Sequence, residues 1–253
     1  MNKRLIPSVS AAISGESVLA MMHRSGGRLG TRIAALVLAT MAVACTSAGQ
    51  GYQDNPVARK LSWFSYIKGD DVRARCEPGM PDRFRFVYNG IYVEQVRTYD
   101  IEPSPLPNYM RMTVRVTEKA NLAEIALDPS KPDFMAPWRP KTAVIDLPAA
   151  EVERLKRALL SDGFFNRAPP ARSISSIEFY WAVSACLDGQ FKLNAYVWPS
   201  RPFDEAAFPK LLFGWDMTDV AINRPRKADT LDVYGTVEPN SVTNYFSLRF
   251  DQS

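Results

Sequence analysis

An apolar stretch near the start of the chain, residues 33–44, determines how much of the sequence is left to build a fold. Its residues are small or hydrophobic apart from Thr40, and three arginines precede it between positions 24 and 32. The stretch has the length of a signal-peptide core, and it is too short to cross a hydrocarbon layer of about 30 Å as a helix of about twenty residues. We therefore expect residues 1–44 to be a signal peptide and the fold to come from the roughly two hundred residues that follow.

The end of this stretch carries a processing signal. Residues 42–44 (Ala-Val-Ala) stand directly before Cys45, and this segment resembles the lipobox of bacterial lipoproteins. The resemblance implies that Cys45 is acylated and becomes the membrane-attached start of the mature chain. Thr46 in place of Asp favours the outer membrane. The same residues fit the Ala-x-Ala rule of ordinary signal peptidase, so release of a soluble chain is the alternative, and translation from Met21 or Met22 would give a compact basic leader.

Charge and histidine content exclude several classes of function. The chain has 31 basic and 27 acidic residues, but residues 1–45 hold five of the basic residues and one of the acidic ones, so 26 of each remain. A neutral mature chain gives no electrostatic reason to expect nucleic-acid binding. The only histidine, His23, lies in the leader, which excludes Ser-His and Cys-His nucleophiles from the mature chain. We predict no catalytic residue, metal site or cofactor.

Two cysteines remain once Cys45 is assigned to the lipid. Cys76 and Cys186 are an even pair in an oxidising compartment, and we expect a disulfide between them. In the chain-entropy model, closing a loop of about 110 residues disfavours the unfolded chain by about 4 to 5 kcal/mol. Two buried free thiols are the alternative.

Two helices are expected in the domain that follows. Residues 46–55 are small and polar and predict a flexible tether, after which residues 56–253 form one domain. Asn55 precedes a proline, and apolar residues at helical spacing predict a short helix to about Ile67. The clearest helix covers residues 148–162, because apolar side chains recur on one face and a glycine follows.

Two turn signals predict β-hairpins. One hairpin covers residues 83–96 around Asn89 and Gly90, and its two-residue turn would place Phe86 opposite Val93.

The second hairpin covers residues 177–198 around Asp188 and Gly189, and its register places Trp181 opposite Tyr196. Further strands are expected at residues 110–117, 143–145, 211–222, 231–237 and 242–250, and proline-rich connections at 102–107 and 128–141. Strands with one clear helix predict an α+β domain with a mainly antiparallel sheet.

An aromatic face of the second hairpin is the first candidate ligand or partner surface. Trp181 and Tyr196 face each other there, Trp198 follows on the same face, and Trp138 and Trp215 are candidates to extend the surface. The competing interpretation is an inner layer against which a helix packs, because aromatic side chains dominate protein cores.

Four arginines form the second candidate surface. Arg83, Arg85, Arg111 and Arg115 are expected on the solvent-exposed face of the first sheet, where their guanidinium groups suit carboxylates or phosphates of envelope polymers. An ordinary solvated face with weak surface ion pairs is the competing interpretation.

These features together predict a lipoprotein of the cell envelope. Its domain is expected to face the periplasm and to serve in binding or scaffolding. Its expected partners are the membrane, through the lipid, and an envelope polymer or protein. One alternative is a histidine-independent hydrolase of an envelope polymer that uses a carboxylate pair such as Asp70 with Asp71 or Asp216 with Asp219. The other is a subunit of a larger envelope complex.

Overall fold

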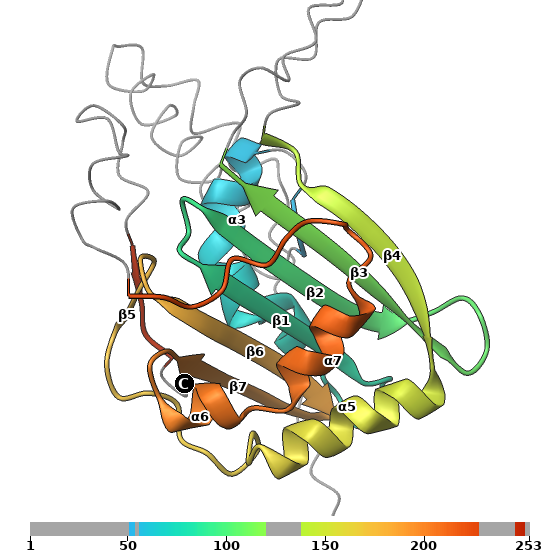
Figure 1. The fold of residues 1–253 in the computed structure, drawn as a ribbon. Coiled ribbons are helices and arrows are strands. Elements are labelled where there is room, and N and C mark those ends of the chain that lie inside the picture. Colours follow the sequence, from blue (N-terminus) through green and yellow to red (C-terminus); the bar gives the residue numbers. More distant parts are fainter. Residues whose placement is uncertain (1–50, 54–55, 120–137, 228–245, 251–253) are drawn as a thin grey trace, which may run out of the picture. The chain divides into compact units, whose positions relative to one another are not determined.

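The computed structural model of the protein describes residues 51–53, 56–119, 138–227 and 246–250, and these residues form an α+β fold (Figure 1). Its centre is a six-stranded antiparallel sheet with the strand order β4-β3-β2-β1-β6-β7. The predicted fold class is therefore confirmed. The elements, in chain order, are α3 (Pro56–Lys68), α4 (Asp70–Ala74), β1 (Arg83–Gly90), β2 (Gln95–Pro103), β3 (Tyr109–Glu118), β4 (Lys141–Pro148), α5 (Ala149–Ser161), β5 (Ile174–Ser175), β6 (Phe179–Leu187), β7 (Gln190–Val197), α6 (Arg201–Glu205), α7 (Phe208–Trp215) and β8 (Ser247–Leu248).

The sheet separates two hydrophobic cores. One core lies between the sheet and helices α5 and α7, and we call this side of the sheet the α5 face. The other core lies between the sheet and α3, on the side that we call the α3 face. Successive side chains of a strand alternate between the faces, so Phe86 of β1 belongs to the first core and Val87 to the second. Figure 1 shows α5 and α7 on one side of the sheet and α3 on the other.

Both predicted helices are present. The short helix expected after residue 55 is α3, although its proposed cap, Asn55, lies outside the described residues. The helix predicted at 148–162 is α5, which buries one apolar face and ends before Gly163, whose φ of 67° suits glycine. The carboxylate of Asp162 at this end accepts a hydrogen bond of 2.9 Å from the backbone N–H of Ala207, and thereby links α5 to the start of α7.

The first predicted hairpin is wrong in its turn and its register. Asn89 and Gly90 belong to strand β1, the chain turns through the next four residues, and Phe86 lies opposite Tyr99. The reason is a tertiary contact. The buried Asn89 side chain donates hydrogen bonds to the backbone oxygens of Ser176 and Glu178, at 2.9 and 2.7 Å, so this asparagine is used inside the sheet.

The second hairpin has the predicted register. Asp188 and Gly189 form its turn with φ values of 51° and 74°, as a type I′ turn requires. Trp181 lies opposite Tyr196, and the pair of Cys186 with Phe191 is also found. The turn sequence and the strand pattern agree here, and no long-range contact overrides them.

The carboxyl-terminal segments differ from the prediction. Residues 211–222 were expected as a strand, but Phe208–Trp215 forms α7 and residues 216–227 then cross the α5 face without strand pairing. Pro209 in the first turn favours this helix, and Phe208 and Leu212, four residues apart, are its buried side chains. The strands at 110–117 and 143–145 are confirmed within β3 and β4. The strand at 231–237 and most of the connection at 128–141 lie outside the described residues, and of 242–250 only β8 is described as a strand, paired with β5.

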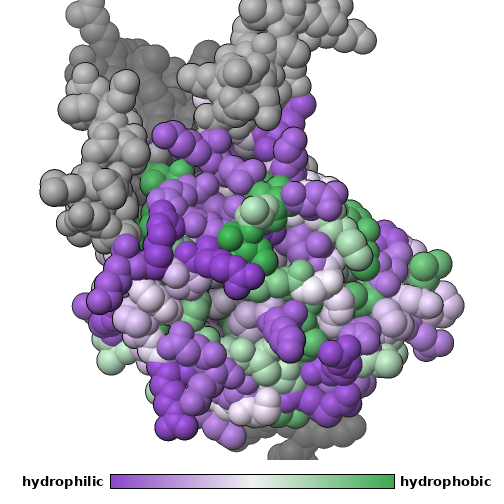
Figure 2. All heavy atoms as spheres, in the orientation of Figure 1, coloured by the Kyte–Doolittle hydropathy of each residue, from purple (hydrophilic) through white to green (hydrophobic). Residues whose placement is uncertain are grey.

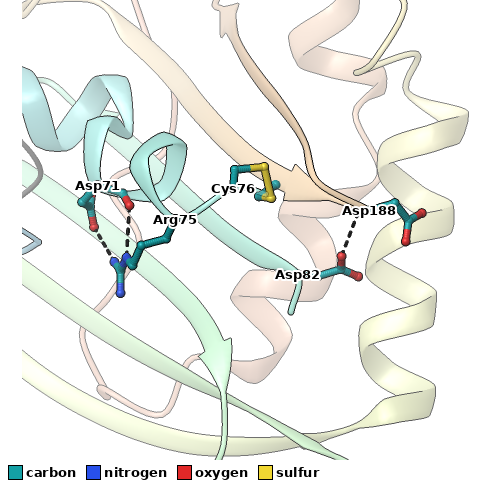
Figure 3. Close-up of a disulfide and its surroundings, with 6 residues drawn as sticks. Asp71, Arg75, Cys76, Asp82 and Asp188 are labelled. Carbon is teal, nitrogen blue, oxygen red and sulfur yellow. Dashed lines mark hydrogen bonds and ion pairs between the residues drawn. A yellow bond between two sulfur atoms is a disulfide. The ribbon is translucent and has the colours of Figure 1, made fainter. Parts of the chain in front are cut away.

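The predicted disulfide is present. Cys76 and Cys186 are bonded, 110 residues apart in sequence, with a Cα–Cα distance of 5.5 Å (Figure 3). The bond joins the chain just after α4 to the end of β6. Beside it, the carboxylate of Asp82 accepts a hydrogen bond of 3.0 Å from the backbone N–H of Asp188, so the turn of the second hairpin is held from the same side.

Replacement of both cysteines, Cys76→Ser with Cys186→Ser, is expected to lower the free energy of unfolding by about 2 to 5 kcal/mol, because the unfolded chain gains the freedom of a long loop. Urea unfolding followed by circular dichroism measures the change. Reduction of the wild-type protein serves as the control and should shift the urea midpoint in the same direction. Equal midpoints for the oxidised wild type and the double variant would contradict the expectation.

Candidate functional site: an aromatic groove

The four predicted arginines lie on one face of the sheet, but they do not form an open surface. The strand register places Arg85 opposite Asp100, and Arg111 opposite Glu102, so these side chains share the α3 face. The side chain of Arg85 is only 2% exposed, because α3 and α4 cover it. The expectation of a solvent-exposed arginine face is therefore wrong for Arg85. Helix packing over a strand is a long-range event that the local sequence does not reveal.

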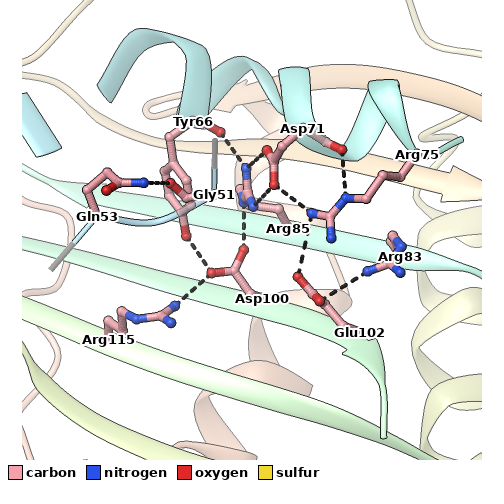
Figure 4. A network of polar contacts seen from close by, with 10 residues as sticks. All are labelled: Gly51, Gln53, Tyr66, Asp71, Arg75, Arg83, Arg85, Asp100, Glu102 and Arg115. Carbon is pink, nitrogen blue, oxygen red and sulfur yellow. Dashed lines mark hydrogen bonds and ion pairs between the residues drawn. The ribbon is translucent and has the colours of Figure 1, made fainter. Parts of the chain in front are cut away.

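Arg85 is the centre of a buried ion-pair network (Figure 4). Its guanidinium donates two hydrogen bonds to the carboxylate of Asp71, at 2.5 and 2.9 Å, and one of 2.6 Å to Asp100. The Tyr66 hydroxyl donates to Asp100 at 2.7 Å, and the Tyr66 ring lies 3.8 Å from the guanidinium carbon of Arg85. Arg115 completes the pairing of Asp100 at 2.8 Å.

The two remaining arginines pair with carboxylates nearer to solvent. Arg83 donates to Glu102 at 3.0 Å, and Arg111 contacts both oxygens of Asp146 at 3.2 and 3.3 Å. All four arginines are thus engaged with carboxylates of the same chain.

The start of α4 determines where Asp71 lies. Gly69 joins α3 to α4 with a φ of 70°, and a Cβ at this position would clash with the hydroxyl of Ser184 on β6. A glycine is therefore required for α4 to begin this close to the sheet, directly over Arg85.

Electrostatics argue against an acid–base role for Asp71. Burial alone would raise its pKa, but hydrogen bonds and the positive charge of Arg85, with a further contribution from Arg75, lower the pKa below its ordinary value. A general acid needs the opposite shift. The suggested pair of Asp70 with Asp71 therefore has one member whose carboxylate is occupied by two arginines.

The aromatic face of the second hairpin is mostly an inner layer. Trp181 and Tyr196 are each 1% exposed, and both rings contact Phe208 of α7 at 5.4 and 5.2 Å between centroids. The expectation of a free aromatic surface is therefore wrong for these two residues, and the competing interpretation of an inner layer is the one observed. Trp198 is only half-buried, and its ring contacts Phe179.

A groove opens beside this layer. Its volume is about 630 Å³, and it lies between the sheet, α6, α7 and the segment that follows α7. Figure 2 shows this side of the molecule, where hydrophobic areas lie among hydrophilic ones. The groove is lined by Tyr88, Trp181, Trp198, Phe203, Asp204, Ala206, Pro209, Lys210, Phe213, Ile222, Arg224 and Pro225. Trp181 and Trp198 therefore both line this candidate site. Trp181 borders the groove, although nearly all of its surface is buried in the core.

The groove combines aromatic side chains with two cations. Lys210 on α7 and Arg224 are both exposed, and neither makes an ion pair or a hydrogen bond with the residues that the structure describes. By contrast, the neighbouring Arg226 is paired with Glu94 at 2.7 Å. Asp204 on α6 is the one carboxylate among the described residues that line the groove. The site can therefore take a ligand with an apolar or flat surface and negative charge.

A second buried arginine holds one wall of the groove in place. Arg97 of β2 is fully buried on the α5 face and pairs with Asp216 at 2.5 Å. It also donates to the backbone oxygens of Val220 and Ala221, the latter at 2.9 Å. The hydroxyl of Tyr99 donates to the same carboxylate of Asp216 at 2.9 Å. These contacts hold the segment that carries Ile222 and Arg224 across the sheet.

Asp216 is likewise unsuited to general acid chemistry. Burial would raise its pKa, but hydrogen bonds from Thr218 and Tyr99 and the charge of Arg97 lower it. Its suggested partner, Asp219, is exposed.

Sequence reasoning missed Lys210, Phe203 and Arg224 as site residues because it expected a strand where α7 lies. The signal that could have located them is the pair of prolines, Pro202 and Pro209, each of which stands in the first turn of a helix. The other aromatic candidates lie elsewhere. Trp138 is exposed and outside the groove lining, whereas Trp215 lines a second groove of about 650 Å³ between α5 and α7, which shares Lys210.

Comparisons with known proteins add no family. No protein-family model, no curated protein and no solved structure matches this chain. Within the described ranges, no helix is long and apolar enough to span a bilayer, and no group of three or more histidine, cysteine or acidic side chains is arranged to hold a metal ion.

Removal of the Asp71 carboxylate is expected to destabilise the protein strongly. Asp71→Asn leaves the buried charge of Arg85 without its bidentate partner, and we expect a loss of about 3 to 5 kcal/mol in the free energy of unfolding at pH 7. Because the pKa of Asp71 is lowered in the folded state, its contribution is full above the unfolded pKa of about 3.9 and disappears as the pH falls through the folded value. Urea unfolding curves of wild type and variant should therefore converge in acid.

Asp146→Asn is the matched control, because it breaks an arginine pair on the same face that is open to solvent. The control should change the urea midpoint little. If Asp71→Asn is no less stable than Asp146→Asn, the buried network does not stabilise the fold as we predict.

Proposed function

We propose that the protein is a lipid-anchored protein of the bacterial cell envelope whose domain binds an anionic, ring-bearing ligand in the aromatic groove. The observation that carries the binding role is the groove itself, which is lined by half-buried aromatic side chains together with Lys210 and Arg224, two cations without a described partner. Trp198, Phe203 and Phe213 supply the aromatic part of this surface.

The anchor rests on the sequence. Residues 42–44 before Cys45 resemble a lipobox, and such processing would place several acyl chains on Cys45. One acyl chain gives only marginal attachment, whereas several hold a protein firmly on a membrane. The disulfide between Cys76 and Cys186 supports an oxidising compartment such as the periplasm.

The chemistry of the groove favours a carboxylate-bearing saccharide from an envelope polymer. Sugar rings stack on aromatic faces, and carboxylates pair with lysine and arginine. The volume of about 630 Å³ lies within the range of small-molecule sites.

The contacts of the carboxylates support binding in preference to hydrolysis. Glycoside hydrolysis requires two carboxyl groups about 5 to 10 Å apart, one of them with a raised pKa. Asp71 and Asp216 lie on opposite faces of the sheet, and each is held by a buried arginine that lowers its pKa.

Acylation of Cys45 can be measured directly. Mass spectrometry of the protein purified from its native membrane is expected to find the mature chain beginning at an acylated Cys45. Cys45→Ala should abolish the acyl mass and the incorporation of labelled palmitate, because the cysteine is the residue that carries the lipid. An unmodified thiol at position 45, or an intact leader, would disprove the anchor.

Ligand binding is tested with soluble muropeptides as the anionic probe and neutral chitin oligosaccharides as the uncharged comparison. Trp198→Ala is expected to weaken muropeptide binding about tenfold in isothermal titration, since one good stacking contact contributes about 1.4 kcal/mol. Trp138→Ala, which removes an exposed tryptophan outside the groove lining, is the control and should leave the affinity unchanged.

Lys210→Gln separates the role of charge from that of stacking. It should weaken muropeptide binding and leave any binding of the neutral oligosaccharide unaffected. If wild type and Trp198→Ala bind the muropeptide with equal affinity, the groove is not the saccharide site.

A further inference from the structure

The outer face of α3 carries an apolar stripe. Val57, Leu61 and Phe64 are 66%, 67% and 45% exposed, and their spacing of four and three residues places them on one side of the helix. Ser62, Trp63, Tyr66 and Ile67 are buried and turn the opposite side of α3 toward the sheet. The helix therefore has a second apolar face, in which Leu61 is the most exposed residue and the half-exposed Phe64 ring also packs edge to face against Phe246 at 5.3 Å between centroids.

Two lysines belong to the same outer face. Lys60 and Lys68 are exposed, and neither forms an ion pair or a hydrogen bond within the described part of the chain. Apolar side chains flanked by lysines are typical of helices that lie at a membrane surface, where the lysines meet anionic headgroups.

The chain between Cys45 and the domain is short. Gly51 to Gln53, part of the predicted flexible tether, are described and partly buried. The ring of Tyr52 packs against Tyr66 of α3 at 5.4 Å, its hydroxyl accepts a hydrogen bond of 3.0 Å from Arg59, and Arg115 lies 4.5 Å from the ring. The tether thus reaches the domain beside α3.

This attachment limits how far the domain can move from the bilayer. Five residues separate Cys45 from Gly51, and the six steps from Cα to Cα, at no more than about 3.6 Å each, span about 20 Å. A lipid on Cys45 would therefore bring the side of the domain that carries α3 to the membrane surface.

We propose that the outer face of α3 is a membrane-contact surface, in which Leu61 and Phe64 enter the headgroup region of an anionic bilayer and Lys60 and Lys68 pair with its phosphates. The proposal rests on the lipid anchor at Cys45. Contact on this side leaves the α5 face, with the aromatic groove, directed away from the membrane.

Depth-dependent fluorescence quenching tests the proposal. Leu61→Cys provides the single free thiol of the acylated, disulfide-bonded chain, and it is labelled with an environment-sensitive fluorophore. Leu160→Cys is the matched control, because Leu160 is a leucine of similar exposure, 59% against 67% for Leu61, on α5 across the sheet. The labelled proteins are reconstituted into phosphatidylglycerol-containing vesicles with nitroxide-labelled lipid.

The label at position 61 is expected to lose about half of its fluorescence, and the label at position 160 to change little, because only an interfacial residue reaches the nitroxide. Phe64→Ser should reduce quenching at position 61. Equal quenching at the two positions, or stronger quenching at 160, would overturn the proposal.

A second arm separates this proposal from the anchor. The chain from position 45 onward, with Cys45→Ser and an amino-terminal hexahistidine tag on nickel-chelating lipid, carries the same labels on a tether that the six added histidines lengthen by at most about 20 Å. Selective quenching at position 61 in this form supports the α3 surface even where mass spectrometry finds no acylation. Its absence overturns the α3 surface even where Cys45 is acylated.

Discussion

The pairing of two buried arginines organises the layers on both sides of the sheet. Arg85 on β1 faces α3 and α4, and Arg97 on the adjacent strand β2 faces the segment after α7. A guanidinium removed from water is tolerated only where carboxylates and carbonyls replace its hydration. Each arginine therefore specifies which segment must lie over it, through Asp71 of α4 on one face and through Asp216 on the other. Apolar packing alone tolerates many arrangements, whereas a bidentate ion pair permits few.

The groove is a consequence of the second of these networks. Its floor is Trp181 of the sheet, and its walls come from α6, α7 and the chain near Arg224, which are brought together only when the segment after α7 crosses the sheet. Arg97 holds that crossing, and Asp162 fixes the start of α7 from the end of α5. Trp181 consequently contributes to the core through Phe208 and to the site through the side that the groove reaches.

The sequence predicted features that depend on near neighbours. The turn at Asp188 and Gly189 fixed the register of the second hairpin because local geometry and strand pattern agree there. Asn89 was misread because its partners are backbone oxygens nearly ninety residues away. The shared face of the four arginines followed from strand alternation, but the burial of Arg85 depends on α4, whose position requires Gly69 and Ser184 to meet. Most of the groove was missed for the same reason, since its walls are distant in sequence and α7 was expected as a strand. The disulfide was predictable because only two cysteines remain once Cys45 is set aside.

The proposed anchor and the proposed groove constrain each other. A domain held at Tyr52 within about 25 Å of its lipid cannot move far from the bilayer, so its effective concentration is high only for material close to the membrane surface. The groove opens on the α5 face, across the sheet from α3. A ligand would thus be met on the side of the domain that points into the periplasm, while the α3 side remains on the lipid. This geometry suits a polymer that runs beside the membrane, because the protein can then contact both surfaces at the same time without a long linker.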